Sequence, residues 1–130
     1  MNRTIVTRTG ALALTGVAVL GLAIPAFAKD GDVIRRGGCS NSSDWKLKAS
    51  PENNRIEVEG EVDSNVGGQT WKWRMLHNGE VSARGTSTTG GRSGSFEARR
   101  VLVDLKGDDH IGFRAKNPNT GEICSGRLTF

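Results

Sequence analysis

The chain has 130 residues, of which 18 are Lys or Arg and 14 are Asp or Glu, giving a formal net charge of +4. It contains two histidines, two cysteines and no tyrosine, so few side chains are available for acid–base, nucleophilic or metal chemistry. The small charge excess argues against nucleic acid or an anionic membrane as the partner.

The first 28 residues have the pattern of an export signal. Two arginines precede an uncharged apolar run over residues 10–24, and Ala26 and Ala28 then form the small-x-small pattern of a cleavage site. We expect cleavage between Ala28 and Lys29, which makes the protein secreted and lowers its net charge from +4 to +2. An apolar run of about 15 residues is shorter than the roughly 20 that span a bilayer, so no membrane association is expected after cleavage.

The remaining residues are expected to form a flexible leader, 29–38, and one domain, 39–130. The leader is polar and Gly-rich and shows no periodicity. Cys39 and Cys124 lie near the two ends of the domain, and outside the cytosol such a pair predicts a disulfide. It would close a loop of about 85 residues and stabilise the fold by roughly 4.5 kcal/mol.

Apolar and polar residues alternate with a period of two through most of the domain. The pattern is clearest over residues 45–49, 56–62 and 71–75, and it is typical of strands with one buried face. No stretch of 11 or more residues has the apolar stripe of a helix. The sequence therefore predicts an all-β fold, an antiparallel sandwich of about seven short strands. Further strands are expected in the runs 80–86, 95–105, 111–115 and 122–130.

Two hairpins give a first prediction of strand register. In the first, Ala49 pairs with Ile56. In the second, Val62 pairs with Trp71, and the cross-strand neighbours this implies are Glu61 with Lys72, Glu59 with Arg74, and Gly60 with Trp73. The charges of three strands would then compensate one another, each pair contributing a few tenths to one kcal/mol.

The turn at His77-Asn78-Gly79 has two possible geometries. A two-residue Asn-Gly loop pairs Met75 with Ser82, whereas a three-residue loop with Gly79 left-handed pairs Met75 with Val81 and Trp73 with Ala83. We favour the three-residue loop because it keeps the apolar residues on one face.

The order of the strands resembles an immunoglobulin or fibronectin type III sandwich. The resemblance is carried by a Trp-bearing third strand and by the closing segments 111–115, 121–124 and 128–130. There is no tyrosine to form a tyrosine corner, and the spacing of Cys and Trp differs from that of antibody domains. The whole sequence also resembles small secreted actinobacterial proteins of unassigned function. These resemblances imply a fold and an extracellular address but no chemistry.

No catalytic, cofactor-binding or metal-binding residue is predicted, and we do not expect an enzyme. His77 falls in a hairpin turn, and His110 follows Asp108-Asp109 in what looks like an acidic turn rather than a metal cluster. Nucleophile-elbow, zinc-protease and phosphate-loop motifs are absent from the sequence.

A secreted, non-catalytic binding or cell-envelope module is the expected function, with an extracellular protein or polysaccharide as partner. One alternative is a carbohydrate-binding module in which Trp71, Trp73 and Arg74 form an indole platform, although their spacing fits core packing better. Another is a protease inhibitor that presents Arg92 on the loop 86–95.

Overall fold

The computed structural model describes residues 31–130, so the predicted signal peptide and its cleavage site at Ala28 and Lys29 lie outside the described part. Residues 31–130 form eight strands and no helix. The strands are β1 (Val33–Gly38), β2 (Asp44–Glu52), β3 (Arg55–Asp63), β4 (Thr70–His77), β5 (Glu80–Thr88), β6 (Ser95–Val103), β7 (His110–Lys116) and β8 (Ile123–Thr129). Within these residues no helix is long and apolar enough to cross a membrane.

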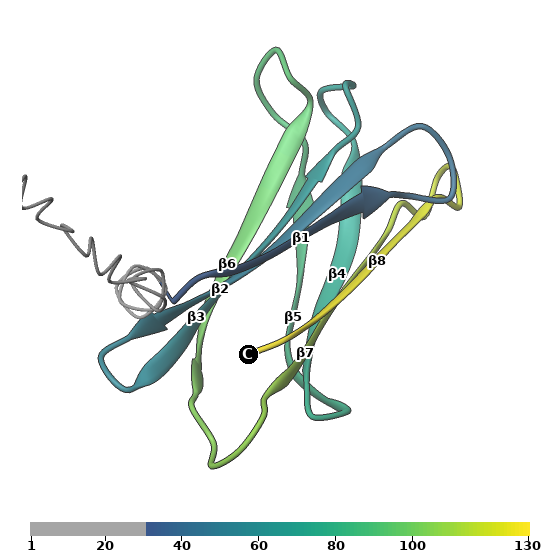
Figure 1. Cartoon of the computed structure of the whole chain (residues 1–130). Coiled ribbons are helices and arrows are strands. Elements are labelled where there is room, and N and C mark those ends of the chain that lie inside the picture. The colour runs from purple at the N-terminus through teal and green to yellow at the C-terminus, as the bar shows by residue number, and fades with distance from the viewer. Residues whose placement is uncertain (1–30) are drawn as a thin grey trace, which may run out of the picture.

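The strands form two four-stranded antiparallel sheets packed face to face (Figure 1). One sheet has the order β1-β2-β3-β6 and the other β5-β4-β7-β8. The predicted all-β antiparallel sandwich is confirmed, with eight strands where about seven were expected. If β2 to β8 are lettered A to G, the sheets read A-B-E and D-C-F-G, with β1 added outside A. A constant-type immunoglobulin domain instead places its fourth strand beside E.

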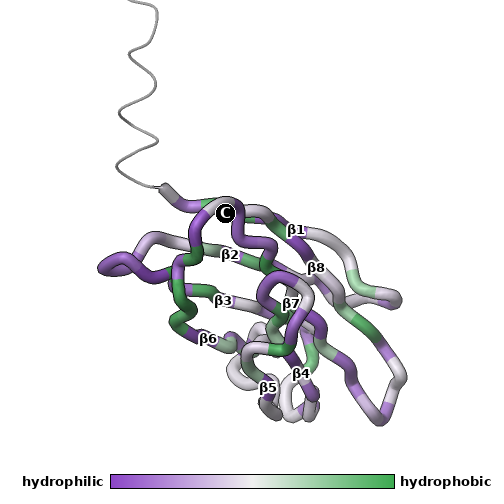
Figure 2. The backbone as a smooth tube through the Cα atoms, turned by 90° about the horizontal axis from the view of Figure 1, so that it is seen from below, coloured by the Kyte–Doolittle hydropathy of each residue, from purple (hydrophilic) through white to green (hydrophobic). Residues whose placement is uncertain are grey.

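Alternation along each strand explains why these residues form sheets. In β3, Ile56, Val58 and Val62 are fully buried, while the glutamates between them are only half-buried on the outer surface. Figure 2 shows hydrophobic and hydrophilic residues alternating along the strands of both layers. A strand with this period buries one face and solvates the other. The core between the sheets includes Leu47, Trp71, Met75, Ile111, Phe113 and Leu128.

Residues 33–38 form a strand, so the prediction of a flexible leader is wrong for them. β1 pairs with β2 in antiparallel register, with Val33 opposite Ala49 and Gly37 opposite Trp45. The leader shows no alternation because its two apolar residues, Val33 and Ile34, are adjacent in sequence; Val33 packs on the core and Ile34 is exposed. Gly37 leaves room for Trp45, whose indole lies 2.7 Å from where a Cβ of residue 37 would stand.

The β2–β3 hairpin has the predicted faces but a different register. Ala49 pairs with Val58 rather than with Ile56, because the hairpin turns at Asn53-Asn54 and extends β2 to Glu52. Both asparagines have positive φ, 46° and 63°, which two-residue hairpin loops require. A shift of two residues keeps every side chain on its predicted face.

The predicted pairing of β3 with β4 is wrong, because the two strands belong to different sheets. β3 pairs with β6 instead, with Glu59 opposite Arg99 and Val62 opposite Phe96. The chain leaves the first sheet at Ser64, which is buried and whose backbone N–H and hydroxyl both donate to the carbonyl of Gly94. These bonds redirect the chain toward the second sheet.

Gly60 accommodates an aromatic ring, but the ring is that of Phe113 and not of Trp73 as predicted. A Cβ at position 60 would overlap the Phe113 ring, which is fully buried against the facing sheet. We expect Gly60→Ala to lower the free energy of unfolding by about 1 to 3 kcal/mol, because the packed core leaves no space into which the Phe113 ring could move.

Urea unfolding of Gly60→Ala and of Gly112→Ala would test this account of the core. A Cβ at Gly112 meets nothing closer than 3.4 Å, so the same substitution there should be nearly neutral. Equal effects of the two substitutions would contradict the packing described for Gly60.

The β4–β5 turn is the two-residue Asn-Gly loop, so the favoured three-residue alternative is wrong. Asn78 and Gly79 both have positive φ, 50° and 87°, as a type I′ turn requires. A β-bulge then shifts the register between Leu76 and Met75, so that Met75 pairs with Ala83. Ser82 is the extra residue. Because of the bulge, Ala83 lies on the same face as Met75. The apolar face of β5 is therefore kept without the longer loop.

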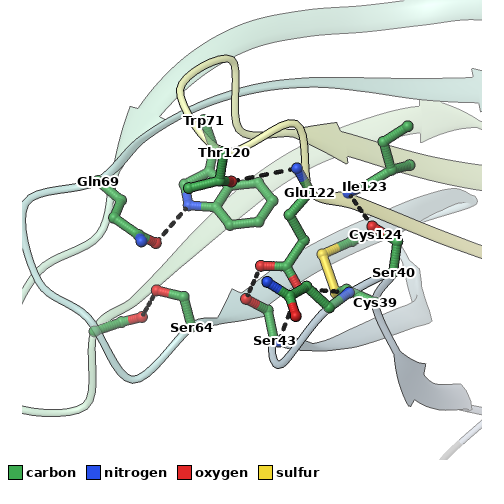
Figure 3. The surroundings of a disulfide bond; sticks show 12 residues. Cys39, Ser40, Ser43, Ser64, Gln69, Trp71, Thr120, Glu122, Ile123 and Cys124 are labelled. Carbon is green, nitrogen blue, oxygen red and sulfur yellow. Dashed lines mark hydrogen bonds between the residues drawn. A yellow bond between two sulfur atoms is a disulfide. The ribbon is translucent and has the colours of Figure 1, made fainter.

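The predicted disulfide between Cys39 and Cys124 is confirmed (Figure 3). It joins the residue that follows β1 to the last strand, across 85 residues of sequence. Next to it, the buried carboxylate of Glu122 accepts hydrogen bonds from the N–H of Asn41 and from the N–H and hydroxyl of Ser43, at 2.6–3.0 Å. The disulfide and these bonds hold the 39–43 turn of the first sheet against β8 of the second. A disulfide is compatible with an extracellular location.

Candidate anion-binding face

The outer face of the sheet β5-β4-β7-β8 is strongly basic. Successive outward positions on β4 and β7 carry cations, and each edge strand adds one more. We call this set the basic face; it consists of Lys72, Arg74, Arg84, Arg114, Lys116 and Arg127. The four strands contain one acidic residue, Glu80, which stands opposite His77 at the end of the β4–β5 hairpin.

Strand register places these cations directly opposite one another. Arg74 pairs with Arg84 on β5 and with Arg114 on β7, so three arginines form a row across the sheet. Lys72 pairs with Lys116 in the neighbouring row. Adjacent strands lie about 4.8 Å apart, and like charges directly opposite on a sheet are destabilising. The fold therefore gains nothing from this arrangement.

No carboxylate of residues 31–130 forms an ion pair with the basic face. The ion pairs in this part of the chain are Lys48 with Asp32, His77 with Asp109, and Arg99 with three glutamates. Arg99 lies on the outer face of the other sheet, 2.7 Å from Glu59, and these carboxylates raise the pKa of its guanidinium further. Cations and anions are mixed on that sheet, whereas the cations of the basic face have no ion-pair partner among residues 31–130.

This distribution corrects the predicted charge ladder. Lys72 and Arg74 do not face Glu61 and Glu59, because β4 is not a neighbour of β3. The glutamates are instead opposite Lys46, Lys48 and the β6 strand. A small net charge conceals this segregation, since the strands of the first sheet carry most of the acidic residues found in strands and those of the second carry only Glu80. Net charge alone is therefore a poor guide to the partner of this chain.

Two hollows lie on the basic face, on either side of the Arg74–Arg114 pair. The larger, of about 670 Å³, reaches from Arg74 over Gly112 to Arg127 on β8, and Arg35 from β1 completes its lining. The smaller, of about 400 Å³, is bordered by Lys72, Lys116 and Arg84. Both are open to solvent, and Arg74 and Arg114 line both of them.

Trp71 and Trp73 do not form an exposed platform beside Arg74. Their exposed fractions are 0% and 5%, and both indoles point into the core, where Trp71 packs near Phe96. Trp73 lies over Gly85 and donates a hydrogen bond to the Ser87 hydroxyl. The structure confirms the alternative of core packing for both tryptophans. Of Trp71, Trp73 and Arg74, only Arg74 faces solvent.

Arg92 is separate from the other predicted ligand-binding residues. It is exposed in a turn that spans only residues 89–94, because residues 86–88 belong to β5. Buried Thr89 fixes the start of this turn through hydrogen bonds to Val66 and Gln69. Arg92 lines neither hollow of the basic face.

Sequence reasoning missed an internal contact of His77. This residue lies at the end of β4, and its Nε2 is 2.5 Å from the fully buried carboxylate of Asp109. Within residues 31–130, His77 makes no hydrogen bond to a hydroxyl or thiol. His110 instead points outward and lines the larger hollow. No group of three or more His, Cys, Asp or Glu in the described residues is arranged to hold a metal ion.

Asp104 lies near this pair. Although the residue is exposed, loss of hydration at its carboxyl group and the neighbouring Asp109 carboxyl raise its pKa above the ordinary 3.8. The folded state thus holds this proton more tightly than the unfolded state does. The contribution of Asp104 to the free energy of unfolding is therefore present at low pH and is lost as the pH rises through the raised pKa.

We therefore expect Asp104→Asn to melt at a higher temperature than the parent at neutral pH, with the difference vanishing below about pH 3.8. Thermal melts between acidic and neutral pH measure this effect. Asp108→Asn removes the same charge from the same loop and is the matched control. If both variants changed the melting temperature alike at every pH, the specific repulsion between Asp104 and Asp109 would be disproved.

Comparison with protein-family models, with curated proteins and with solved structures found no match.

Proposed function

We propose that this chain is a secreted, non-catalytic binding module that holds an anionic polymer on the basic face. The observation that supports it best is the row Arg84–Arg74–Arg114, in which like charges stand directly opposite one another without a counterion in the described residues. Such a row is unfavourable in the free protein and becomes favourable when a polyanion lies across it.

The residues that line the two hollows support a charged polymer rather than a neutral sugar. Neutral carbohydrates are usually recognised by exposed aromatic rings, and the indoles of Trp71 and Trp73 are in the core. The basic face offers guanidinium groups instead, which bind phosphate and carboxylate with two parallel hydrogen bonds. The open shape of both hollows suits a linear chain that crosses several strands.

The salt dependence of binding tests this proposal. We expect the purified, oxidised protein to bind immobilised polyphosphate or a polyuronate, with an affinity that falls steeply as salt is added. If about four cations are engaged, the logarithm of the association constant should fall with a slope of about −3 to −4 against the logarithm of salt concentration.

A charge-matched variant makes the test specific to the basic face. Lys46→Glu changes the charge by the same amount as a reversal on the basic face, but Lys46 lies on the other sheet, opposite Glu61. It should leave the affinity and the slope almost unchanged. Failure to bind any polyanion, or binding that Lys46→Glu weakens as much as a substitution on the basic face, would contradict the proposal.

A further inference from the structure

We infer that the polymer carries phosphate and that one phosphate group sits in the hollow over Gly112. This inference rests on the proposed function and adds the ligand's chemistry to it. We call this part of the larger hollow the Gly112 subsite.

The subsite exists because β7 has no side chain at the centre of its outer face. Gly112 stands opposite Leu76 on β4 and opposite Arg127 on β8. A Cβ placed there would lie 3.4 Å from Leu76, in ordinary van der Waals contact, and φ is not in the left-handed region. The backbone therefore does not require glycine at this position, and the open space above it is left for a ligand.

Four arginine residues from four different strands line this space. They are Arg35 on β1, Arg74 on β4, Arg114 on β7 and Arg127 on β8. His110, Ser125 and Thr129 add polar atoms at the rim, and no carboxylate lines the hollow.

The arrangement of the arginines favours phosphate over carboxylate. A carboxylate holds its two oxygens in one plane, which one bidentate guanidinium group can satisfy. A phosphate group within a polymer carries a single charge as well, but its oxygens are arranged tetrahedrally around phosphorus, so guanidinium groups can approach it from several directions. Arginines from different strands around one hollow are matched better by this tetrahedral group. Arginine is also the residue of choice where phosphate is recognised.

The same surface argues against single-stranded nucleic acid as the source of that phosphate. Proteins that bind single strands combine cations with exposed aromatic rings on which bases stack. Trp71, Trp73, Phe96 and Phe113 are buried, and Trp45 and Phe130 pack against the core. A phosphate polymer without bases fits this surface better.

Filling the subsite tests the inference without removing a charge. Gly112→Val places a β-branched side chain in the hollow, and valine is favoured in strands, so the fold should be retained. Affinities for polyphosphate and for polyglutamate of matched charge would be compared by calorimetry. Thr88→Val, on β5 and outside both hollows, is the control. Thermal melts would check that all variants are folded.

We expect the parent to bind polyphosphate about tenfold more tightly than polyglutamate. Gly112→Val should remove that preference by weakening polyphosphate alone, and Thr88→Val should change neither affinity. Equal binding of the two polymers by the parent, or an equal effect of Gly112→Val on both, would overturn the subsite and leave the proposed function standing. If neither polymer bound, the proposed function would fail as well.

A third polymer identifies the source of the phosphate. Double-stranded DNA carries phosphate on a rigid backbone and does not need a stacking surface. DNA binding that equals polyphosphate binding and is weakened by Gly112→Val would support the phosphate subsite while overturning the preference for a polymer without bases.

Discussion

Arg74→Glu should make the protein more stable and at the same time impair its binding. The substitution turns two like-charge cross-strand pairs, with Arg84 and with Arg114, into two opposite-charge pairs. Each such change contributes roughly 0.2 to 1 kcal/mol, so the free energy of unfolding should rise by about 0.5 to 2 kcal/mol. Affinity for a polyanion should fall on the order of a hundredfold at about 50 mM salt, because a carboxylate replaces the central cation of the row.

Urea unfolding and a binding titration on the same preparation measure the two effects together. Arg74→Gln removes the charge without reversing it and should lie between the parent and Arg74→Glu in both assays. A loss of stability in Arg74→Glu would mean that this row contributes to the fold. Unchanged binding would mean that the polymer lies elsewhere.

Removing the disulfide should have the largest effect on stability. Replacing Cys39 and Cys124 together by alanine opens a loop of 85 residues in the unfolded chain, which lowers the free energy of unfolding by about 4 kcal/mol. Domains of this size are stable by only about 5 to 15 kcal/mol. The double variant should therefore unfold at a much lower urea concentration. Its free energy of unfolding should depend more steeply on urea, because the unfolded chain without the cross-link exposes more surface.

Chemical reduction of the parent provides an independent comparison with this variant. The reduced parent and the double alanine variant should unfold at nearly the same urea concentration. A loss below about 1 kcal/mol in both would show that the hydrogen bonds of Glu122 with Asn41 and Ser43 hold the two sheets together without the disulfide.

The face that each residue occupies could be predicted from the sequence, because alternation depends only on neighbouring residues. Ile56, Val58, Trp71 and Trp73 are buried as their period-two pattern indicates. The disulfide was also predictable, since Cys39 and Cys124 have no other partners.

Strand neighbours could not be predicted in the same way. The alternation of apolar and polar residues does not indicate whether β4 continues the sheet of β3 or starts the opposite sheet. The predicted pairing of β3 with β4 assumed the first arrangement, which is wrong. The difference is made by contacts distant in sequence, such as those of Ser64 with Gly94 and of Gly60 with Phe113. β1 was missed because its polar residues gave no periodic signal.

The basic face was only partly visible in the sequence for the same reason. Lys72 and Arg74 were noticed, but they were assigned to glutamates of a strand that lies in the other sheet. Arg84, Arg114 and Arg127 become their neighbours only when β5, β7 and β8 are assembled around β4. A signal was present, because the outward positions of β4 and β7 carry Lys or Arg in succession without an acidic residue between them.

Mapping backbone amide shifts by NMR while polyphosphate is added tests the central claim most directly. We expect saturable shifts at the basic face, centred on Arg74, Gly112 and Arg114, with the amides of β2 and β3 unaffected. Shifts concentrated on the sheet β1-β2-β3-β6 or in the turn around Arg92, or no saturable shifts at low salt, would contradict it.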